Sequence, residues 1–168
     1  MNIETTITNL QSKNEGIVLK AIDECRSKGN EKVLPALLDL LISTKNQEIS
    51  EAIQSILFEL KSSKAGDVII QYLEIEKSKN HREILVSALW QSGIACEEHL
   101  TLLVKLACEG NYLTALEVLT VIENLEGALN EEEVMECLYT LQEAITEESD
   151  EEKSKLLQSL VLVLEGIR

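Results

Sequence analysis

The stretch VLPALLDLLISTKNQEISEAIQSILFEL, residues 33–60, contains two segments in which apolar residues recur at intervals of three and four. That spacing places apolar side chains along one face of an α-helix. The polar link at residues 44–46 is short, so the two helices are expected to fold back on each other as an antiparallel hairpin. Leucine and isoleucine occupy so many positions that each helix is expected to contact neighbours on two sides.

The same spacing continues along the chain and predicts about ten helices. They are expected near residues 3–12, 16–28, 31–43, 47–62, 66–77, 81–93, 97–109, 111–126, 131–146 and 150–167. Several boundaries carry stretches that contain glycine or asparagine, at 28–31, 64–67, 109–111 and 126–133. No segment alternates apolar and polar residues for long enough to form a sheet. The 168-residue chain is therefore predicted to be all-α, in one domain with its own core.

Four segments superpose on one another at a nearly constant period. They read EKVLPALLDLL, AGDVIIQYLEI, EEHLTLLVKLA and EEEVMECLYTL. One aligned column contains Val33, Val68, Leu100 and Val134, and a second contains Leu37, Tyr72, Val104 and Leu138. The first column has intervals of 35 residues (33 to 68), 32 residues (68 to 100) and 34 residues (100 to 134). Such a period is typical of arrays of stacked helix pairs, in which each pair buries its apolar faces against its neighbours.

Residues 31–60 closely resemble the pattern of HEAT repeats, a family of armadillo-type α-solenoids. Pro35 near a helix start and the leucines after it stand where the family has its packing residues. Where HEAT repeats often have an Asp in the turn and an Arg early in the next helix, this chain has residues 44–46 and Ser50, so stacking is expected to rest on apolar contacts. The resemblance implies a right-handed α-α superhelix in one domain. Residues 1–14 would be a capping helix, 15–146 about four repeats, and 147–168 a second capping helix.

The resemblance also implies a non-catalytic scaffold that binds another protein. In HEAT-repeat proteins the second helices of the pairs line the inner surface, which marks the outward-facing residues of those helices as candidates for partner contact. They are Lys32, Asp39, Gln71, Glu74, Thr101, Lys105, Glu136 and Glu143. HEAT-like arrays include enzymes as well, namely bilin lyases and DNA-repair glycosylases, so an enzyme subunit such as a bilin lyase stays open as an alternative.

Formal charge is distributed very unequally within the total of −15. Residues 1–82 carry 11 Lys and Arg against 12 Asp and Glu, whereas residues 83–168 carry 4 against 18. Nucleic acid and anionic membranes require the opposite sign, so both are excluded as expected partners. A basic protein is expected instead, either as a scaffolded partner or as a toxin or nuclease that an acidic immunity protein would neutralise. Two other interpretations stay open: carboxylates at helix N-termini stabilise the helices themselves, and surface charge maintains solubility.

No motif for catalysis or cofactor binding is present, so no catalytic residue and no cofactor is predicted. The sequence lacks both G-x-x-x-x-G-K and G-x-G-x-x-G, and it has only two histidines. Cys96 and His99, one helical turn apart, are the nearest approach to a metal-ligand pair, but a structural zinc site needs four ligands and no second pair follows. Trp90 and Tyr72 lie on apolar stripes and are predicted to be in the core, with binding hot spots as the alternative.

A cytoplasmic location is expected, because the N-terminus has no basic start followed by an apolar stretch and a cleavage site. The longest apolar runs, at 40–42 and 161–164, are far too short to span a bilayer. The four cysteines are expected to be reduced thiols, mostly in the core. The apolar C-terminal segment at 159–168 is expected to pack inward; the alternative is that it mediates self-association.

Overall fold

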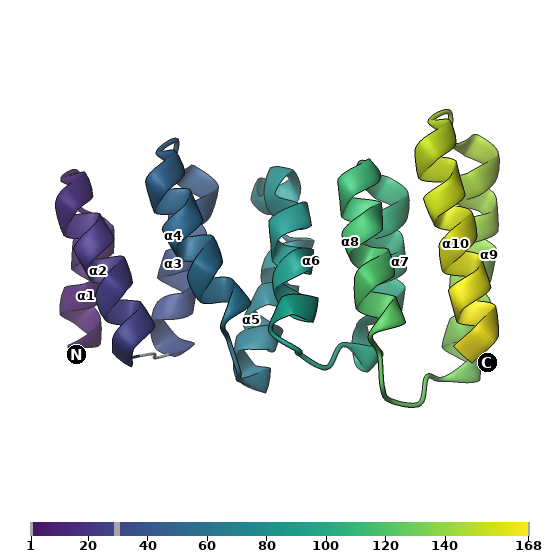
Figure 1. Ribbon diagram of the computed structural model, residues 1–168, viewed down its shortest axis with the longest axis horizontal. Helices are drawn as coiled ribbons and strands as arrows, with labels where there is room; N and C mark the ends of the chain where they lie inside the picture. Colours follow the sequence, from purple (N-terminus) through teal and green to yellow (C-terminus); the bar gives the residue numbers. More distant parts are fainter. Residues whose placement is uncertain (1, 29–30, 168) are drawn as a thin grey trace. The chain divides into compact units, whose positions relative to one another are not determined.

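The computed structural model describes residues 2–28 and 31–167, and these residues are all-α, as predicted, with no strand. They form ten α-helices (Figure 1). The bounds are α1 Ile3–Leu10, α2 Glu15–Lys28, α3 Leu34–Ser43, α4 Gln47–Phe58, α5 Ser63–Glu74, α6 Arg82–Gln91, α7 Leu100–Glu109, α8 Tyr112–Glu123, α9 Glu131–Glu147 and α10 Glu151–Ile167. Part of the boundary signal at 28–31 falls on residues 29–30, which lie outside the described residues. None of the helices within residues 2–28 and 31–167 combines the length and the apolar composition of a membrane span.

Three short 3-10 helices account for some of the differences from the predicted bounds; α4 and α8 also end four and three residues earlier than predicted, and α5 begins three residues earlier. The 3-10 helices are η1 Glu31–Val33, η2 Glu76–His81 and η3 Glu97–His99. Two of them form the first turn of a segment predicted as one helix, before α3 and α7. Proline at the start of α3 fits this arrangement. Proline has no backbone N–H, and the amides of the first helical turn have no hydrogen-bond partner within the helix in any case.

Asparagine side chains set the start of several helices. The Asn46 side chain accepts a hydrogen bond from the amide of Ile49 at 3.2 Å, and so caps α4. Asn111 caps α8 in the same way through Thr114, at 2.9 Å. Each cap satisfies an amide that the first helical turn leaves without a partner. The polar link at residues 44–46 therefore works as a helix start, although it lacks the Asp and Arg of the HEAT pattern.

The chain divides into two compact units, residues 1–81 and 82–168, which are described separately; the single domain stays a prediction. In unit 1, α1 packs on α2 and α3 packs on α4, so two hairpins form as expected. The helix α2 lies beside α4, whereas α1 lies beside α3 and α3 beside α5 (Figure 1). Unit 1 therefore has two layers, one made of α2 and α4 and the other of α1, α3 and α5.

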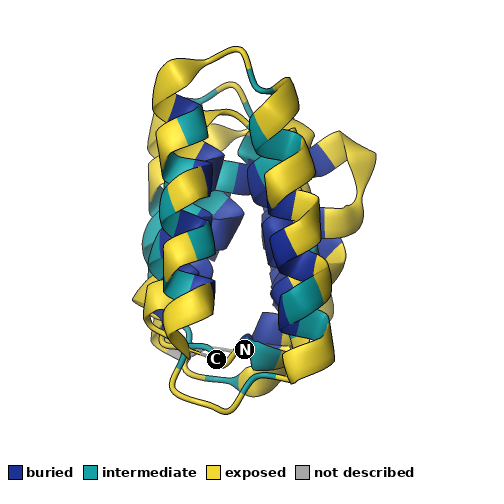
Figure 2. Ribbon diagram, turned by 90° about the vertical axis from the view of Figure 1, so that its right-hand side faces the viewer, coloured by how far each residue is buried: buried dark blue, intermediate teal, exposed yellow. Residues whose placement is uncertain are grey.

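Unit 2 repeats the two-layer arrangement. The pairs α7–α8 and α9–α10 are hairpins. The helix α8 lies between α6 and α10 in one layer, and α7 lies beside α9 in the other. Buried positions run along the helix sides that face the opposite layer, and exposed positions lie on the outer sides (Figure 2).

The two aligned columns of the repeat supply core residues in both units. Seven of their eight members are buried, and the exception, Val68, is half-buried. The C-terminal helix packs inward as expected, because Leu157, Leu160 and Leu164 are fully buried. Its outer side leaves Leu162 exposed at 68%. Cys25, Cys96 and Cys137 are buried, Cys108 is half-buried, and all four are free thiols.

Candidate protein-binding surfaces

All eight residues predicted to contact a partner are exposed. Lys32 lies in η1 and Asp39 in α3, and Gln71 and Glu74 lie in α5, all within unit 1. In unit 2, Thr101 and Lys105 are on α7, and Glu136 and Glu143 are on α9. The structure thus places the candidates on one layer of each unit. Whether any of them binds a partner stays a prediction.

In unit 1, a groove between α1 and α3 is bordered by two of the candidates, Lys32 and Asp39. Its volume is about 570 Å³, and Ile7, Pro35 and Leu40 supply part of its apolar lining. The groove has a cation and an anion at its rim. Because these two charges have opposite signs, the groove favours neither an anionic nor a cationic ligand.

Asp39 is held by two residues of the same unit. Its Oδ1 atom lies 2.6 Å from Nζ of Lys77 and accepts a hydrogen bond from the Tyr72 hydroxyl at 3.0 Å. The Lys77 ammonium also lies over the Tyr72 ring, 5.5 Å from its centroid. Tyr72 is in the core, as predicted, and is 9% exposed. Burial, and then the Asp39 carboxylate, raise the pKa of Tyr72 to about 12.

We expect the free energy of unfolding of the protein to fall between about pH 10 and pH 12, and to fall less in Tyr72→Phe. The phenol has an ordinary pKa of 10.0 and a folded pKa of about 12. In this range the unfolded chain releases the proton that the folded chain retains, so the stabilisation present below pH 10 is lost as pH rises. Urea unfolding at several pH values, followed by circular dichroism, measures the effect. Equal pH dependence in the two proteins would contradict it.

In unit 2, the solvent-facing side of α9 carries a stripe of carboxylates around an exposed aromatic ring. Glu132, Glu136, Glu143 and Glu147 are all exposed, and Tyr139 among them is 62% exposed. Their spacing of three and four residues places the five side chains on one face of the helix. We call this set the α9 stripe. Tyr139 was missed by the sequence reasoning, although its place between Leu138 and Thr140, outside the apolar column, could have marked it as outward-facing.

The neighbouring helix α7 adds a more neutral border to the stripe. The amide and the hydroxyl of Thr101 both donate to Oε1 of Glu133, at 3.1 and 2.8 Å, which ties α7 to α9. Lys105 lies 3.8 Å from Glu109 on its own helix. The opposite charges of Lys105 and Glu109 offset each other on α7. The negative charge of the surface that α7 and α9 share therefore comes mainly from α9.

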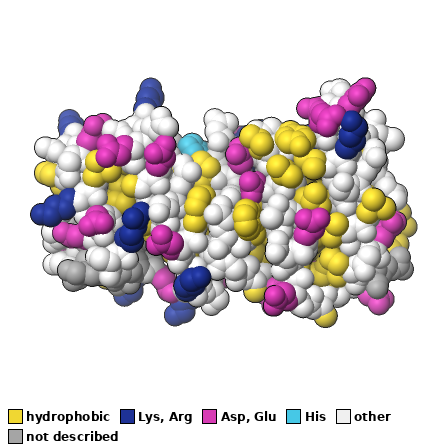
Figure 3. Space-filling view, viewed as in Figure 1, with side chains coloured by type: hydrophobic (Ala, Val, Ile, Leu, Met, Phe, Trp, Pro, Cys, Tyr) yellow, Lys and Arg dark blue, Asp and Glu magenta, His cyan; other side chains and the backbone are white. Residues whose placement is uncertain are grey.

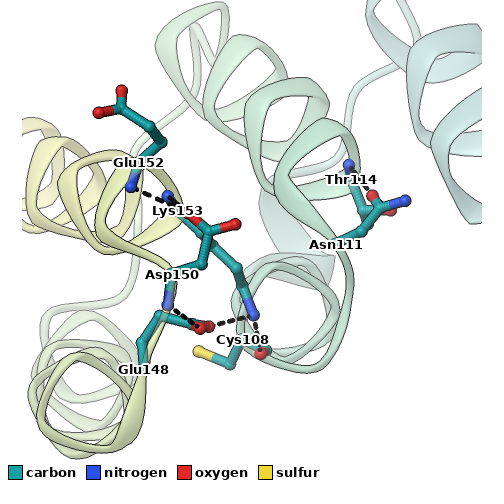
Figure 4. A network of polar contacts seen from close by, with 7 residues as sticks. All are labelled: Cys108, Asn111, Thr114, Glu148, Asp150, Glu152 and Lys153. Carbon is teal, nitrogen blue, oxygen red and sulfur yellow. Dashed lines mark hydrogen bonds and ion pairs between the residues drawn. The ribbon is translucent and has the colours of Figure 1, made fainter.

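A buried ion pair holds the turn between α9 and α10 against the end of α7. Lys153 donates from Nζ to the Cys108 carbonyl at 2.8 Å and lies 2.7 Å from Oε2 of Glu148 (Figure 4). The Lys153 and Glu148 side chains are only 9% and 16% exposed. Asp150 accepts from the Lys153 amide and so caps α10. The hydrogen bond from Lys153 keeps the pKa of Glu148 below its ordinary value.

The environment of Cys96 and His99 argues against metal binding at this pair. Cys96 is 1% exposed, and its thiol donates to the Ile94 carbonyl at 3.1 Å. Burial, and then the nearby Glu97, raise the pKa of Cys96 to about 11, which disfavours the thiolate that a metal would need. Within residues 2–28 and 31–167, no group of three or more His, Cys, Asp or Glu is placed to hold a metal ion.

The prediction that Trp90 lies in the core is wrong. The side chain is 38% exposed at the end of α6, and its indole N–H donates to Oε2 of Glu117 on α8 at 2.6 Å. The ring lies in the last turn of α6, and a polar partner on the neighbouring helix holds it at the surface. Apolar side chains also gather on the outer side of α8 and its neighbours (Figure 3).

The described surfaces of unit 2 thus offer two features for recognition, the α9 stripe and the exposed Trp90 ring. Neither of them combines a nucleophile with a base. Comparison of the sequence with protein-family models and with curated proteins gives no match.

Proposed function

We propose that this protein is a non-catalytic protein-binding scaffold of the HEAT-repeat type, built as a right-handed α-α superhelix of about four helix pairs with terminal helices. Two observations support the proposal. Each unit arranges its consecutive helices in two layers, with the hairpins α1–α2 and α3–α4 in unit 1 and α7–α8 and α9–α10 in unit 2, and the residues of both aligned columns lie in or at the core. A cytoplasmic location belongs to the proposal, because four free cysteines suit a reducing compartment.

The proposed partner is a basic protein, and the proposed contact surface is the α9 stripe with the adjoining residues of α7. The carrying observation is the exposed Tyr139 among four exposed carboxylates on one helix face. Tyrosine is enriched at binding hot spots, and its ring can also accept a cation on its face. Carboxylates around it would attract and orient lysine and arginine side chains.

Affinity purification from the native host, followed by mass spectrometry, would supply the partner for the test. Association of the purified pair is then measured at several salt concentrations. Because the attraction is electrostatic, the association rate constant should fall steeply with added salt. A basic toxin or nuclease as the partner would identify the protein as an inhibitor. Association that is indifferent to salt would contradict the proposal.

We expect the double variant Glu136→Gln, Glu143→Gln to lower the association rate constant about threefold to tenfold at low salt, because it removes two charges from the stripe. The matched control is Glu151→Gln, Glu165→Gln, which removes two exposed carboxylates from α10 in the same unit. Both variants have the same net charge. Equal slowing in both would assign the effect to net charge and would contradict a binding site at the stripe.

A further inference from the structure

A pocket of about 260 Å³ lies where the ends of α6 and α8 meet the loops that follow them, within unit 2. Trp90 forms part of its wall. The rest of the lining comes from the segment after α6, including Glu97, and from the end of α8 with the loop that follows it, including Glu126. The pocket shares no lining residue with the α9 stripe. Its volume is smaller than that of most sites for drug-sized ligands, so it suits a compact group.

The Trp90 ring is held in this wall by a specific contact. Its N–H donates to Glu117 Oε2 at 2.6 Å, so the polar edge of the indole is already satisfied. The rest of the ring is available as a π surface, and the side chain is 38% exposed. Indole is the aromatic side chain that attracts cations most strongly.

All the formal charge in the lining is negative. It comes from Glu97 and Glu126, and none of the lining residues is Lys, Arg or His. The Glu97 pKa lies below its ordinary value, because its own amide, and also those of Gly127 and Glu126, hydrogen-bond to the carboxylate. Glu97 is therefore anionic at neutral pH. Glu126 is exposed beside it.

Both loops around the pocket are held in place. Glu97 Oε1 accepts from the Gly127 amide at 2.9 Å, and a Cβ at residue 127 would lie 2.8 Å from Glu97 side-chain atoms, so a larger residue there would displace this carboxylate. Gly93 adopts a φ of 64° just after α6, where the Ile94 amide donates to the Leu89 carbonyl at 3.0 Å. This is the turn that commonly ends a helix with glycine in the left-handed conformation. The pocket is thus formed by ordered backbone on both sides.

We propose that this pocket binds a compact organic cation, with its charge against the Trp90 ring and the carboxylates of Glu97 and Glu126. An aromatic wall combined with anionic groups is the chemistry that recognises quaternary ammonium and guanidinium groups. Two sources share that chemistry: a free quaternary ammonium compound, and an arginine side chain of a protein. This proposal does not depend on the α9 stripe.

Trp90 is the only tryptophan in the chain, so its fluorescence reports directly on the pocket. The full chain is titrated at constant ionic strength with choline, with N-acetyl-arginine amide, and with 3,3-dimethylbutan-1-ol, which has the shape of choline without the charge. We expect a saturable change in Trp90 fluorescence with at least one of the two cations, and no change in fluorescence with the alcohol. The cation that binds more tightly identifies the source, a free ligand for choline and a protein side chain for the arginine compound.

Two variants test the site itself. Glu126→Gln should weaken binding of the cation about fivefold, because it removes one carboxylate from the wall. Glu123→Gln is the matched control, since Glu123 is an exposed residue at the end of α8 outside the lining, and its variant should bind as the parent does. The proposal would be overturned by no response to either cation, by equal binding of the neutral alcohol, or by equal weakening in the two variants.

Discussion

Replacing Lys153 by methionine is expected to lower the free energy of unfolding of unit 2 well beyond the effect of the same change at the exposed Lys155. Methionine fills a similar volume, but it leaves the Glu148 carboxylate and the Cys108 carbonyl without the ammonium that lies 2.7 and 2.8 Å away. Removing one partner of a buried ion pair leaves an uncompensated charge in a poorly solvated place, which is costly. Urea unfolding followed by Trp90 fluorescence measures the change, because the only tryptophan lies in unit 2.

Lys155→Met is the matched control for this prediction. Lys155 lies two residues away on α10 and is 2.6 Å from Glu152, but both side chains are mostly exposed. Water solvates such a pair whether or not it forms, so we expect no measurable loss of stability. Adding Glu148→Gln to Lys153→Met should restore part of the loss, because the unpaired charge is removed. Equal losses in Lys153→Met and Lys155→Met would show that burial of the pair is not the cause.

Leu103→Ala is expected to destabilise unit 2 by about 2–5 kcal/mol. Leu103 is fully buried on α7, the helix that packs on both α8 and α9. Truncation removes apolar contacts and leaves a cavity that neighbouring helices fill only in part. The same urea experiment with Trp90 fluorescence gives the midpoint and the slope. If the dependence of the unfolding free energy on urea concentration is unchanged, the lower midpoint reflects a loss of stability.

Leu162→Ala is the control for the cavity. The chemical change is the same, but Leu162 is 68% exposed on α10, so truncation creates no void. We expect a change within about 0.5 kcal/mol. A large loss in this variant would instead indicate that Leu162 is covered in solution, and would favour self-association through the C-terminal helix.

The order of helices was predictable because it depends on local patterns. Each helix has apolar residues at intervals of three and four, and links that contain Asn46, Asn111 or Gly110 separate neighbours. These signals act over a few residues, so they can be read without knowing the fold. Burial of the two aligned columns followed from the same periodicity. The 3-10 turn η2 at 76–81 was missed, because no apolar stripe marks it.

The functional surfaces were predictable only in part. Glu136 and Glu143 were identified as outward-facing, and both are exposed. That Tyr139 lies exposed between them was missed, because a single tyrosine in a helical segment is compatible with a buried or an exposed position. Trp90 was assigned to the core because it lies on an apolar stripe, and its contact with Glu117, 27 residues away, has no local signal.

The sequence alone determined the all-α class, the number and approximate bounds of the helices, the core columns and the concentration of negative charge after residue 83. Tertiary structure alone decided the pairing of Lys153 with Glu148 and Cys108, the exposure of Trp90, and the pocket that Trp90 shares with Glu97 and Glu126. The physical reason is the distance along the sequence over which each kind of interaction acts. Helix periodicity and capping depend on residues within about one turn, whereas an ion pair or a pocket depends on which distant side chains the packing of helices brings together.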